Sequence, residues 1–198
     1  MTSEPSPQPM PDFALARRAM VDSQLRPQGV TDHAVLAAMA AVPREDFLPE
    51  AARPLAYTDR SLPLGEGYSL MPPASLARLL TEVMPRRGER ALVVGSGNGY
   101  APAVLAAMGL AVETAEAGAL PSKGQYDVIL IDGAVEQVPT QLAQRLAPEG
   151  RLATAIADNG ITRLAIGRCA SGVLGFKRFA DSEVPILPGF SRPRAFTF

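Results

Sequence analysis

Residues 89–109, ERALVVGSGNGYAPAVLAAMG, constrain the fold more than any other stretch of this 198-residue chain. An apolar run, residues 91–94, meets Gly95, Gly97 and Gly99, and an apolar helical pattern follows. This order predicts a buried strand, a tight glycine turn and the start of a helix. Glycines let a ligand approach the backbone where a Cβ would clash, and the first turn of a helix leaves N–H groups free to bind polar or anionic atoms.

The spacing of the glycines indicates which ligand such a turn suits. It is G-x-G-x-G, and Tyr100 stands where the dinucleotide fingerprint has its third glycine. This favours the nucleoside cradle of S-adenosylmethionine (AdoMet) methyltransferases over an NAD site. The same pattern also fits a tight strand-to-helix turn that binds no ligand, so the glycines alone leave both interpretations open.

Composition argues against several classes of function. A formal net charge of −1 gives no reason to expect binding to nucleic acid or to an anionic membrane. No apolar run reaches the roughly 18 residues that a membrane span needs. Cys169 is the only cysteine, so an internal disulfide is impossible and a cysteine-based zinc site is not expected. The only histidine, His33, follows Thr31 and Asp32 at an expected helix start and has no partners that suggest a metal site or a catalytic triad.

The N-terminal residues 1–12 are rich in proline and serine and lack the basic start and apolar core of a signal peptide. We expect a disordered tail there, a single domain over residues 13–198, and a cytoplasmic, reducing location. Within the domain, we expect N-terminal helices and an irregular but ordered loop over residues 13–73. The α/β core with a β-rich C-terminus then spans residues 74–198.

Apolar periodicity and Gly/Pro punctuation divide the chain into expected elements. Helices are expected over residues 13–27, from a cap at Thr31 or Asp32 to Pro43, over 74–84, and over 138–150 with Gly150 at its end. Strands are expected over residues 91–94, 110–118, 125–134 and 151–157, followed by short β-like runs to the C-terminus. Strands that alternate with helices in this way indicate a parallel α/β sheet.

Several short motifs occur in one order: MVDSQLRPQGVTDHAVLAAM, VPREDFLP, AYTDRSLPLGEG, ALVVGSGNGY, YDVILIDGAVEQVP and QRLAPEGRL. Over roughly residues 17–155 they resemble protein-L-isoaspartate O-methyltransferases. The resemblance implies a Rossmann-like class I methyltransferase sheet with helices on both faces and an N-terminal helical extension.

It also implies methyl transfer from AdoMet to the side carboxylate of an L-isoaspartyl residue in a damaged protein. The ester then cyclises to a succinimide and reopens, partly as normal aspartate. Since a sulfonium is a good leaving group, alignment of carboxylate and methyl would provide most of the catalysis.

The resemblance also assigns residues to the cofactor. The implied AdoMet-binding residues are Gly95, Ser96, Gly97, Gly99, Glu116 and Asp132. Glu116 would accept hydrogen bonds from the ribose hydroxyls, as the acidic residue about 20 positions after a nucleotide loop does; a solvated charge beside a turn is the alternative. Asp132 would border the methionine part of AdoMet or the substrate, and a helix cap is its alternative. No metal ligands are implied.

The loop expected to hold the substrate departs from the family pattern. The family often has G-Q-T-I-S-Q-P, where this chain has GYSLMPP, residues 67–73. Met71 replaces the serine regarded as the active-site residue, and a thioether cannot form the strong hydrogen bonds of a hydroxyl. Ser69 replaces the threonine and is the candidate catalytic residue if the loop shifts. Val93 stands where the family often has an acid.

The second departure is a short interval. Only nine residues, 117–125, separate Glu116 from Tyr126. A parallel crossover with its helix needs at least about 10–12 residues, and a helix with a further strand needs more. We therefore expect one edge helix–strand unit to be missing, which leaves the second strand at the edge and could weaken or abolish AdoMet binding.

Three functions stay open from the sequence. The first is an AdoMet-dependent methyltransferase whose partners are isoaspartyl-containing peptides or proteins. The second is a non-catalytic methyltransferase-like binding protein, and the third is a methyltransferase with a different carboxylate acceptor. Neither nucleic acid nor a membrane is an expected partner, and the oligomeric state is not predicted.

Overall fold

The computed structural model describes residues 12–96, 99–170 and 173–192. The helices are α1 (Phe13–Met20), α2 (His33–Ala41), α3 (Pro73–Val83), α4 (Tyr100–Ala107) and α5 (Thr140–Ala143). The strands are β1 (Leu62–Gly65), β2 (Tyr68–Leu70), β3 (Arg90–Val94), β4 (Ala111–Ala115), β5 (Tyr126–Val135), β6 (Leu146–Asp158), β7 (Ile161–Ala170) and β8 (Val173–Asp181). A π-helical turn, η1 (Val21–Leu25), and two 3-10 turns, η2 (Arg44–Phe47) and η3 (Glu50–Leu55), complete the elements.

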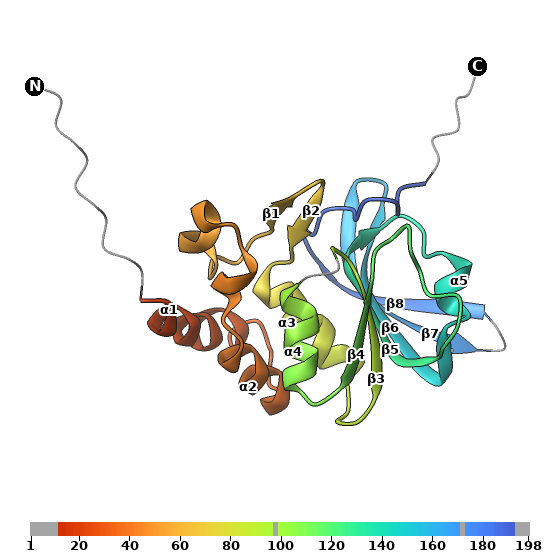
Figure 1. The fold of residues 1–198 in the computed structure, drawn as a ribbon, viewed down its shortest axis with the longest axis horizontal. Helices are drawn as coiled ribbons and strands as arrows, with labels where there is room; N and C mark the ends of the chain where they lie inside the picture. The colour runs from red at the N-terminus through yellow and green to blue at the C-terminus, as the bar shows by residue number, and fades with distance from the viewer. Residues whose placement is uncertain (1–11, 97–98, 171–172, 193–198) are drawn as a thin grey trace, which may run out of the picture.

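The architecture is built on a six-stranded sheet with the order β4-β3-β5-β6-β7-β8 (Figure 1). Strands β4, β3, β5 and β6 run parallel, and β7 and β8 continue the sheet antiparallel. This confirms the expected parallel α/β sheet with a β-rich C-terminus. A separate antiparallel hairpin, β1–β2, lies at the end of the sheet where the parallel strands finish.

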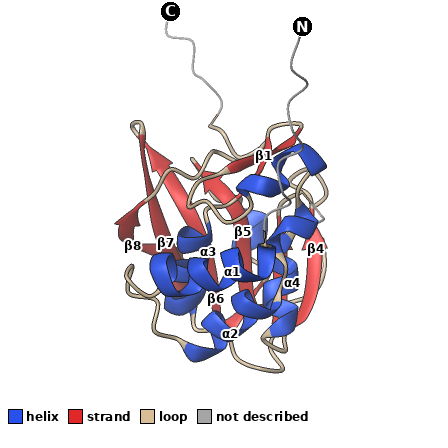
Figure 2. Cartoon of the chain, turned by 90° about the vertical axis from the view of Figure 1, so that its left-hand side faces the viewer, coloured by secondary structure: helices blue, strands red, loops and turns tan. Residues whose placement is uncertain are grey.

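Both faces of the central strands are buried, because alternate side chains enter two different cores. On β5, Val128 and Leu130 belong to one core, whereas Ile129 and Ile131 belong to the other. Burial on both faces explains why these strands read as continuous apolar runs. Helices α3 and α4 pack directly against the first face, and α2 packs on both of them. Figure 2 shows these helices in front of the sheet.

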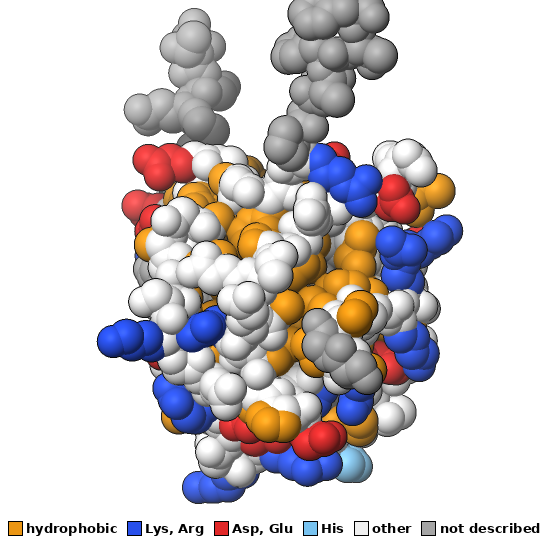
Figure 3. All heavy atoms as spheres, turned by 90° about the vertical axis from the view of Figure 1, so that its right-hand side faces the viewer, with side chains coloured by type: hydrophobic (Ala, Val, Ile, Leu, Met, Phe, Trp, Pro, Cys, Tyr) orange, Lys and Arg blue, Asp and Glu red, His pale blue; other side chains and the backbone are white. Residues whose placement is uncertain are grey.

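The opposite face has a thinner cover. Within the described parts of the chain its only helix is the four-residue α5, which contributes Leu142. Leu120, Leu187 and Phe190 add to the cover from segments outside the helices and strands. Figure 3 views this face and shows apolar side chains gathered near its middle. Residues 116–125 form neither helix nor strand, so β4 is an edge strand and the expected helix–strand unit is indeed missing.

The N-terminal region agrees with the sequence prediction. The helix expected over residues 13–27 is present as α1 and η1. Asp32 caps α2 by accepting hydrogen bonds from the N–H groups of Ala34 and Val35, and His33 is exposed in its first turn. Nearly all of the expected tail lies outside the described residues. In the described ranges no helix has the length and apolar character needed to cross a membrane.

The helix predicted over residues 138–150 is wrong. The helix α5 has only four residues, and strand β6 follows it closely. Ala147 precedes Pro148, and a residue before proline disfavours the helical region. Gly150 does not end a helix; a Cβ there would lie 2.9 Å from the carbonyl oxygen of Tyr126, so the glycine lets an irregular stretch of β6 approach β5.

Arg151 joins the sheet to the end of α3. Its guanidinium donates to the carbonyl oxygens of Val83 and Met84 and pairs with the carboxylate of Glu89 at 2.9 Å. Burial acts to raise the pKa of Glu89, but hydrogen bonds from Arg151 and from the Arg86 N–H outweigh burial and hold it below its ordinary value. The ionised pair therefore contributes stability above the ordinary glutamate pKa, and this contribution is lost as the pH falls through the lowered pKa.

Replacing Arg151 with alanine should lower the free energy of unfolding by about 3 kcal/mol, because it leaves a half-buried carboxylate and two carbonyls without partners. Urea denaturation at neutral pH measures the loss. The matched control is Arg163→Ala, which breaks an exposed pair with Asp181 and should cost no more than about 1 kcal/mol. Equal losses in the two variants would show that the Arg151 cluster does not anchor α3 to the sheet.

Candidate functional site

The glycine turn and the second-strand acid meet at the carboxyl edge of the parallel strands. In the register of β3 and β4, Val94 lies opposite Ala115. The Gly95 N–H donates to the Ala115 carbonyl oxygen at 2.9 Å. Glu116 is the next residue and is exposed. The structure thus brings two predicted cofactor residues, Gly95 and Glu116, together beyond neighbouring strands.

The remaining loop residues are partly described. Ser96 is half-buried, and Gly97 lies outside the described residues. Gly99 has an extended backbone and directly precedes α4. A Cβ on Gly95 would lie 3.2 Å from the Cβ of Asp132, and a Cβ on Gly99 would lie 3.6 Å from its Oδ2. Gly95 therefore lets the loop pack closely against Asp132, whereas a Cβ on Gly99 would make only an ordinary van der Waals contact with it.

Asp132 lies within β5, which continues to Val135, so it is not a helix cap. The residue keeps some exposed surface, but its Oδ1 is inaccessible to solvent and has no hydrogen-bond partner among the described residues. Burial raises the pKa of Asp132 to about 6, and the positive charge of Arg44 opposes that rise. Asp132 is therefore a carboxyl group whose protonation changes close to neutral pH.

Arg44 is a fully buried cation from the turn η2. Its Nε donates to the Ala56 carbonyl oxygen at 2.7 Å, and its Nη2 donates to the carbonyl oxygen of Met71. Its Nη1 has no partner among the described residues, and the guanidinium lies 5.0 Å from the ring centroid of Tyr100. Burial lowers the pKa of Arg44 to about 10, so the side chain stays charged at neutral pH.

Tyr100 completes this buried polar group. Its hydroxyl is inaccessible and unpartnered within the described ranges, and burial raises its pKa. Neither Arg44 nor Tyr100 was predicted from the sequence as a site residue. The only available signal was their position inside the motifs VPREDFLP and ALVVGSGNGY, because their burial depends on packing between distant segments.

Ser69 and Met71 border a narrow crevice together with Asp132. Gly67, Gly133 and residues 184–187 complete its lining. Its volume is about 10 Å³, roughly the space of one water molecule. Ser69 is half-buried and Met71 is buried. The structure therefore places the candidate catalytic serine and Asp132 along one crevice, but that crevice is closed to a side chain.

Residues 184–187 close this crevice because they are tied to β5. The Ala134 N–H donates to the Pro185 carbonyl oxygen, and the Leu187 N–H donates to the Ala134 carbonyl oxygen, both at 2.8 Å. A Cβ on Gly133 would lie only 2.9 Å from the Cβ of Leu187.

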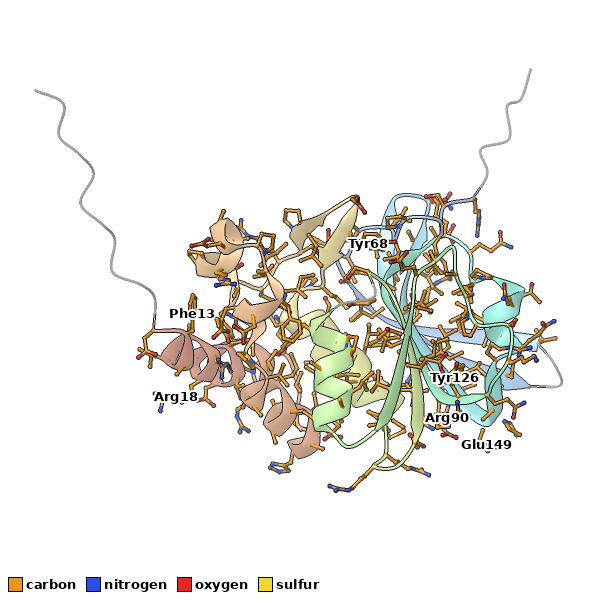
Figure 4. All side chains as sticks on the ribbon, viewed as in Figure 1. Phe13, Arg18, Tyr68, Arg90, Tyr126 and Glu149 are labelled. Carbon is orange, nitrogen blue, oxygen red and sulfur yellow. The ribbon has the colours of Figure 1, made fainter. Side chains whose placement is uncertain are left out.

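The site residues lie at one end of the sheet only. In Figure 4, Tyr68 of β2 lies at the crevice end, whereas Arg90, Tyr126 and Glu149 lie at the other. At that other end the Arg90 guanidinium stacks over the Tyr126 ring at 5.4 Å, which is a structural contact. In the parts of the chain that the structure describes, no cluster of three or more His, Cys, Asp or Glu side chains could hold a metal ion.

The fold, together with the glycine turn at the carboxyl edge of the parallel strands, defines a Rossmann-like methyltransferase. Solved structures agree: a Plasmodium falciparum protein described as a protein-L-isoaspartate O-methyltransferase, in complex with S-adenosyl-L-homocysteine, aligns with a TM-score of 0.73 at 19% identity. That alignment covers 87% of this chain and 98% of the other. A second solved protein-L-isoaspartate O-methyltransferase also has a TM-score of 0.73, at 20% identity, and covers 88% and 67% of the two chains.

Sequence comparison gives the particular family. The family model of protein-L-isoaspartate(D-aspartate) O-methyltransferase matches residues 16–117. A protein-L-isoaspartate O-methyltransferase of Methylorubrum extorquens (strain PA1) is 36% identical, over 92% of each chain. One of Roseiflexus sp. (strain RS-1) is 33% identical, over 90% of this chain and 94% of its own. The chain belongs to the protein-L-isoaspartate O-methyltransferase family.

The sequence alignment with the Methylorubrum protein runs over 211 positions, more than the 198 residues of this chain. The relative therefore carries residues that have no counterpart here.

Replacing Gly133 with alanine should lower the free energy of unfolding by about 1–3 kcal/mol, because the new Cβ overlaps Leu187. Urea denaturation gives this value. Gly118→Ala is the control, since a Cβ there meets nothing within 4 Å and should change stability by no more than about 0.5 kcal/mol. In the double variant with Leu187→Gly, which removes the Leu187 Cβ, the two losses should not add; strict additivity would mean that Leu187 does not press on Gly133.

Proposed function

We propose that this protein transfers a methyl group from AdoMet to the side carboxylate of L-isoaspartyl residues, as a step in the repair of damaged proteins. Membership of the family supports the reaction. One observation carries the proposal. Gly95 and Glu116 lie close together at the carboxyl edge of the sheet, and Ser69 and Asp132 lie beside them. The names of the relatives and the ligand of the Plasmodium structure support AdoMet as the cofactor.

The residues present fit the nucleoside end of AdoMet. Gly95 and Gly99 carry no side chain that would stand between the turn and a ligand, and the exposed Glu116 carboxylate would accept hydrogen bonds from ribose hydroxyls. Ser96 and Gly97 would complete the loop around the cofactor. When bound, AdoMet supplies an electrophilic methyl group whose leaving group is a neutral thioether.

The acceptor end needs a change of shape. A crevice of about 10 Å³ cannot admit a carboxylate-bearing side chain, so residues 184–187 must move away from β5 when the acceptor binds. The Ser69 hydroxyl would then hydrogen-bond the acceptor. The Arg44 guanidinium fixes the Met71 carbonyl and supplies a positive charge near the incoming carboxylate.

Two alternatives have an observation in their favour. The buried Met71 and the closed crevice favour a non-catalytic methyltransferase-like binding protein. The altered loop, with Ser69 in place of a threonine and Met71 in place of a serine of the family pattern, favours a different carboxylate acceptor. The expected single domain over residues 13–198 and a cytoplasmic location stay predictions.

Calorimetric titration with S-adenosylhomocysteine should show binding in the micromolar range. Glu116→Gln should weaken it about tenfold, since one charge-assisted hydrogen bond to the ribose is lost. The control is Glu149→Gln, because Glu149 is exposed at the opposite end of the sheet. No heat of binding and no change in melting temperature, together with no methyl transfer to an isoaspartyl peptide, would favour the non-catalytic protein.

Ser69→Ala should lower kcat/KM for an isoaspartyl peptide about tenfold, because an orienting hydrogen bond to the acceptor is lost. Affinity for S-adenosylhomocysteine should not change. Ser23→Ala, at an exposed position of η1, is the control. Full activity of the Ser69 variant would remove Ser69 from the catalytic machinery.

A further inference from the structure

Asp132 stands between the two halves of the proposed site. On one side it packs against the glycine turn, where it borders Gly95, Ser96 and Gly99 with no open volume between them. On the other side it lines the crevice that contains Ser69. A methyl group carried at the glycine turn and a carboxylate entering the crevice would therefore meet beside the Asp132 carboxyl group.

Among the side chains that line the crevice, the Ser69 hydroxyl is the only ready hydrogen-bond donor for a carboxylate. Met71 offers none, Pro185 has no N–H, and the Leu187 N–H is already bonded to Ala134. Asp132 has a buried Oδ1 without a partner in the described ranges. An ionised Asp132 would repel an acceptor carboxylate, whereas a protonated Asp132 would be a donor for it.

We propose that Asp132 binds the acceptor carboxylate through a shared proton and so supplies the donor that is absent at Met71. In the complex the Asp132 carboxyl is protonated and donates a hydrogen bond to one acceptor oxygen. This inference rests on the proposed function, whose acceptor carboxylate it positions.

The proton and electron balance is simple. The other acceptor oxygen forms the new bond to the methyl carbon, the carbon–sulfur bond breaks, and the sulfur keeps the electron pair. The proton stays on Asp132 during this step. The ester that forms is neutral and holds that proton less strongly than the carboxylate did, so Asp132 returns it to solvent.

The electrostatics of the free protein agree with this role. Burial already raises the pKa of Asp132 to about 6, and a second carboxylate within hydrogen-bond distance raises it further. The free protein is then mostly ionised at Asp132 at neutral pH, and binding of the acceptor takes up a proton.

The other charged and titratable groups around this site act through Arg44. Arg44, from η2, is the cation that opposes the rise in the pKa of Asp132. Tyr100 from α4, together with Tyr57 and Asp59 from the loop before β1, acts on Arg44. Burial raises the pKa of both phenols, that of Tyr57 to about 12. Ser69, Met71 and residues 184–187 add no titratable side chain to the crevice.

The test compares Asp132→Asn and Asp132→Ala with the wild-type protein, and Asp181→Asn, at an exposed carboxylate of β8, is the control. The first readout is the pH profile of kcat/KM for an isoaspartyl peptide. The second readout is the number of protons taken up on peptide binding. It is measured by titrating the same peptide into the protein–S-adenosylhomocysteine complex in a calorimeter, in buffers of different ionisation enthalpy.

In the wild-type protein kcat/KM should fall on the alkaline side, and about one proton should be taken up per peptide bound. Asp132→Asn keeps a donor at every pH, so it should retain activity within a few-fold, lose the alkaline decline and take up no proton. Asp132→Ala should lose about 10- to 100-fold in kcat/KM, the range for one hydrogen bond to a charged group. Asp181→Asn should match the wild type.

Failure of this inference is distinct from failure of the proposed function. If the wild type methylates the peptide but binds it without proton uptake, or if Asp132→Ala is as active as the wild type, Asp132 does not hold the acceptor. If Asp132→Ala fails to fold, the profile and proton uptake of Asp132→Asn decide alone. A wild type that neither binds nor methylates the peptide overturns the proposed function, and the role of Asp132 falls with it.

Discussion

The chain has to cross from the carboxyl end of β4, past β3, to the amino end of β5 with only ten residues, 116–125. Ten residues span at most about 36 Å when fully extended. The five residues of β3 already take up about 16 Å of this length. A helix rises only about 1.5 Å per residue, so it cannot fit into this crossing. The segment runs irregularly, and the sheet face that a crossover helix would cover has to be covered by other residues.

The C-terminal segment, residues 184–190, belongs both to this cover and to the site. Leu187 and Phe190 are buried in the core of the thinly covered face. The same segment pairs with Ala134 and closes the crevice beside Ser69. An acceptor that opens the crevice therefore disturbs part of a hydrophobic core. Its binding has to offset that loss, which links the affinity for the acceptor to the stability of this face.

Local pattern was sufficient to predict most of the sheet. The apolar runs of β3 and β5, the glycine turn and the position of Glu116 follow from residues close together in sequence. The short interval after Glu116, set against the family pattern, predicted the missing unit. The helix expected over residues 138–150 failed because its apolar spacing was weighed above Pro148, which disfavours helix at the residue before it. The closure of the crevice by residues 184–187 was not predictable, because it depends on a contact between β5 and a segment about 50 residues away.

The buried cluster of Arg44, Tyr100 and Asp132 was not predictable from the sequence for the same reason. Arg44, Tyr100 and Asp132 come from three distant segments, and each has one buried atom without a partner in the described residues. A buried polar atom left without a hydrogen bond costs about 1–3 kcal/mol, and more when it is charged. A ligand that supplies the missing partners removes this cost on binding, so it gains more here than from the same contacts on an exposed surface. An acceptor carboxylate that shares a proton with Asp132 and faces the Arg44 cation would satisfy groups that folding alone leaves unsatisfied.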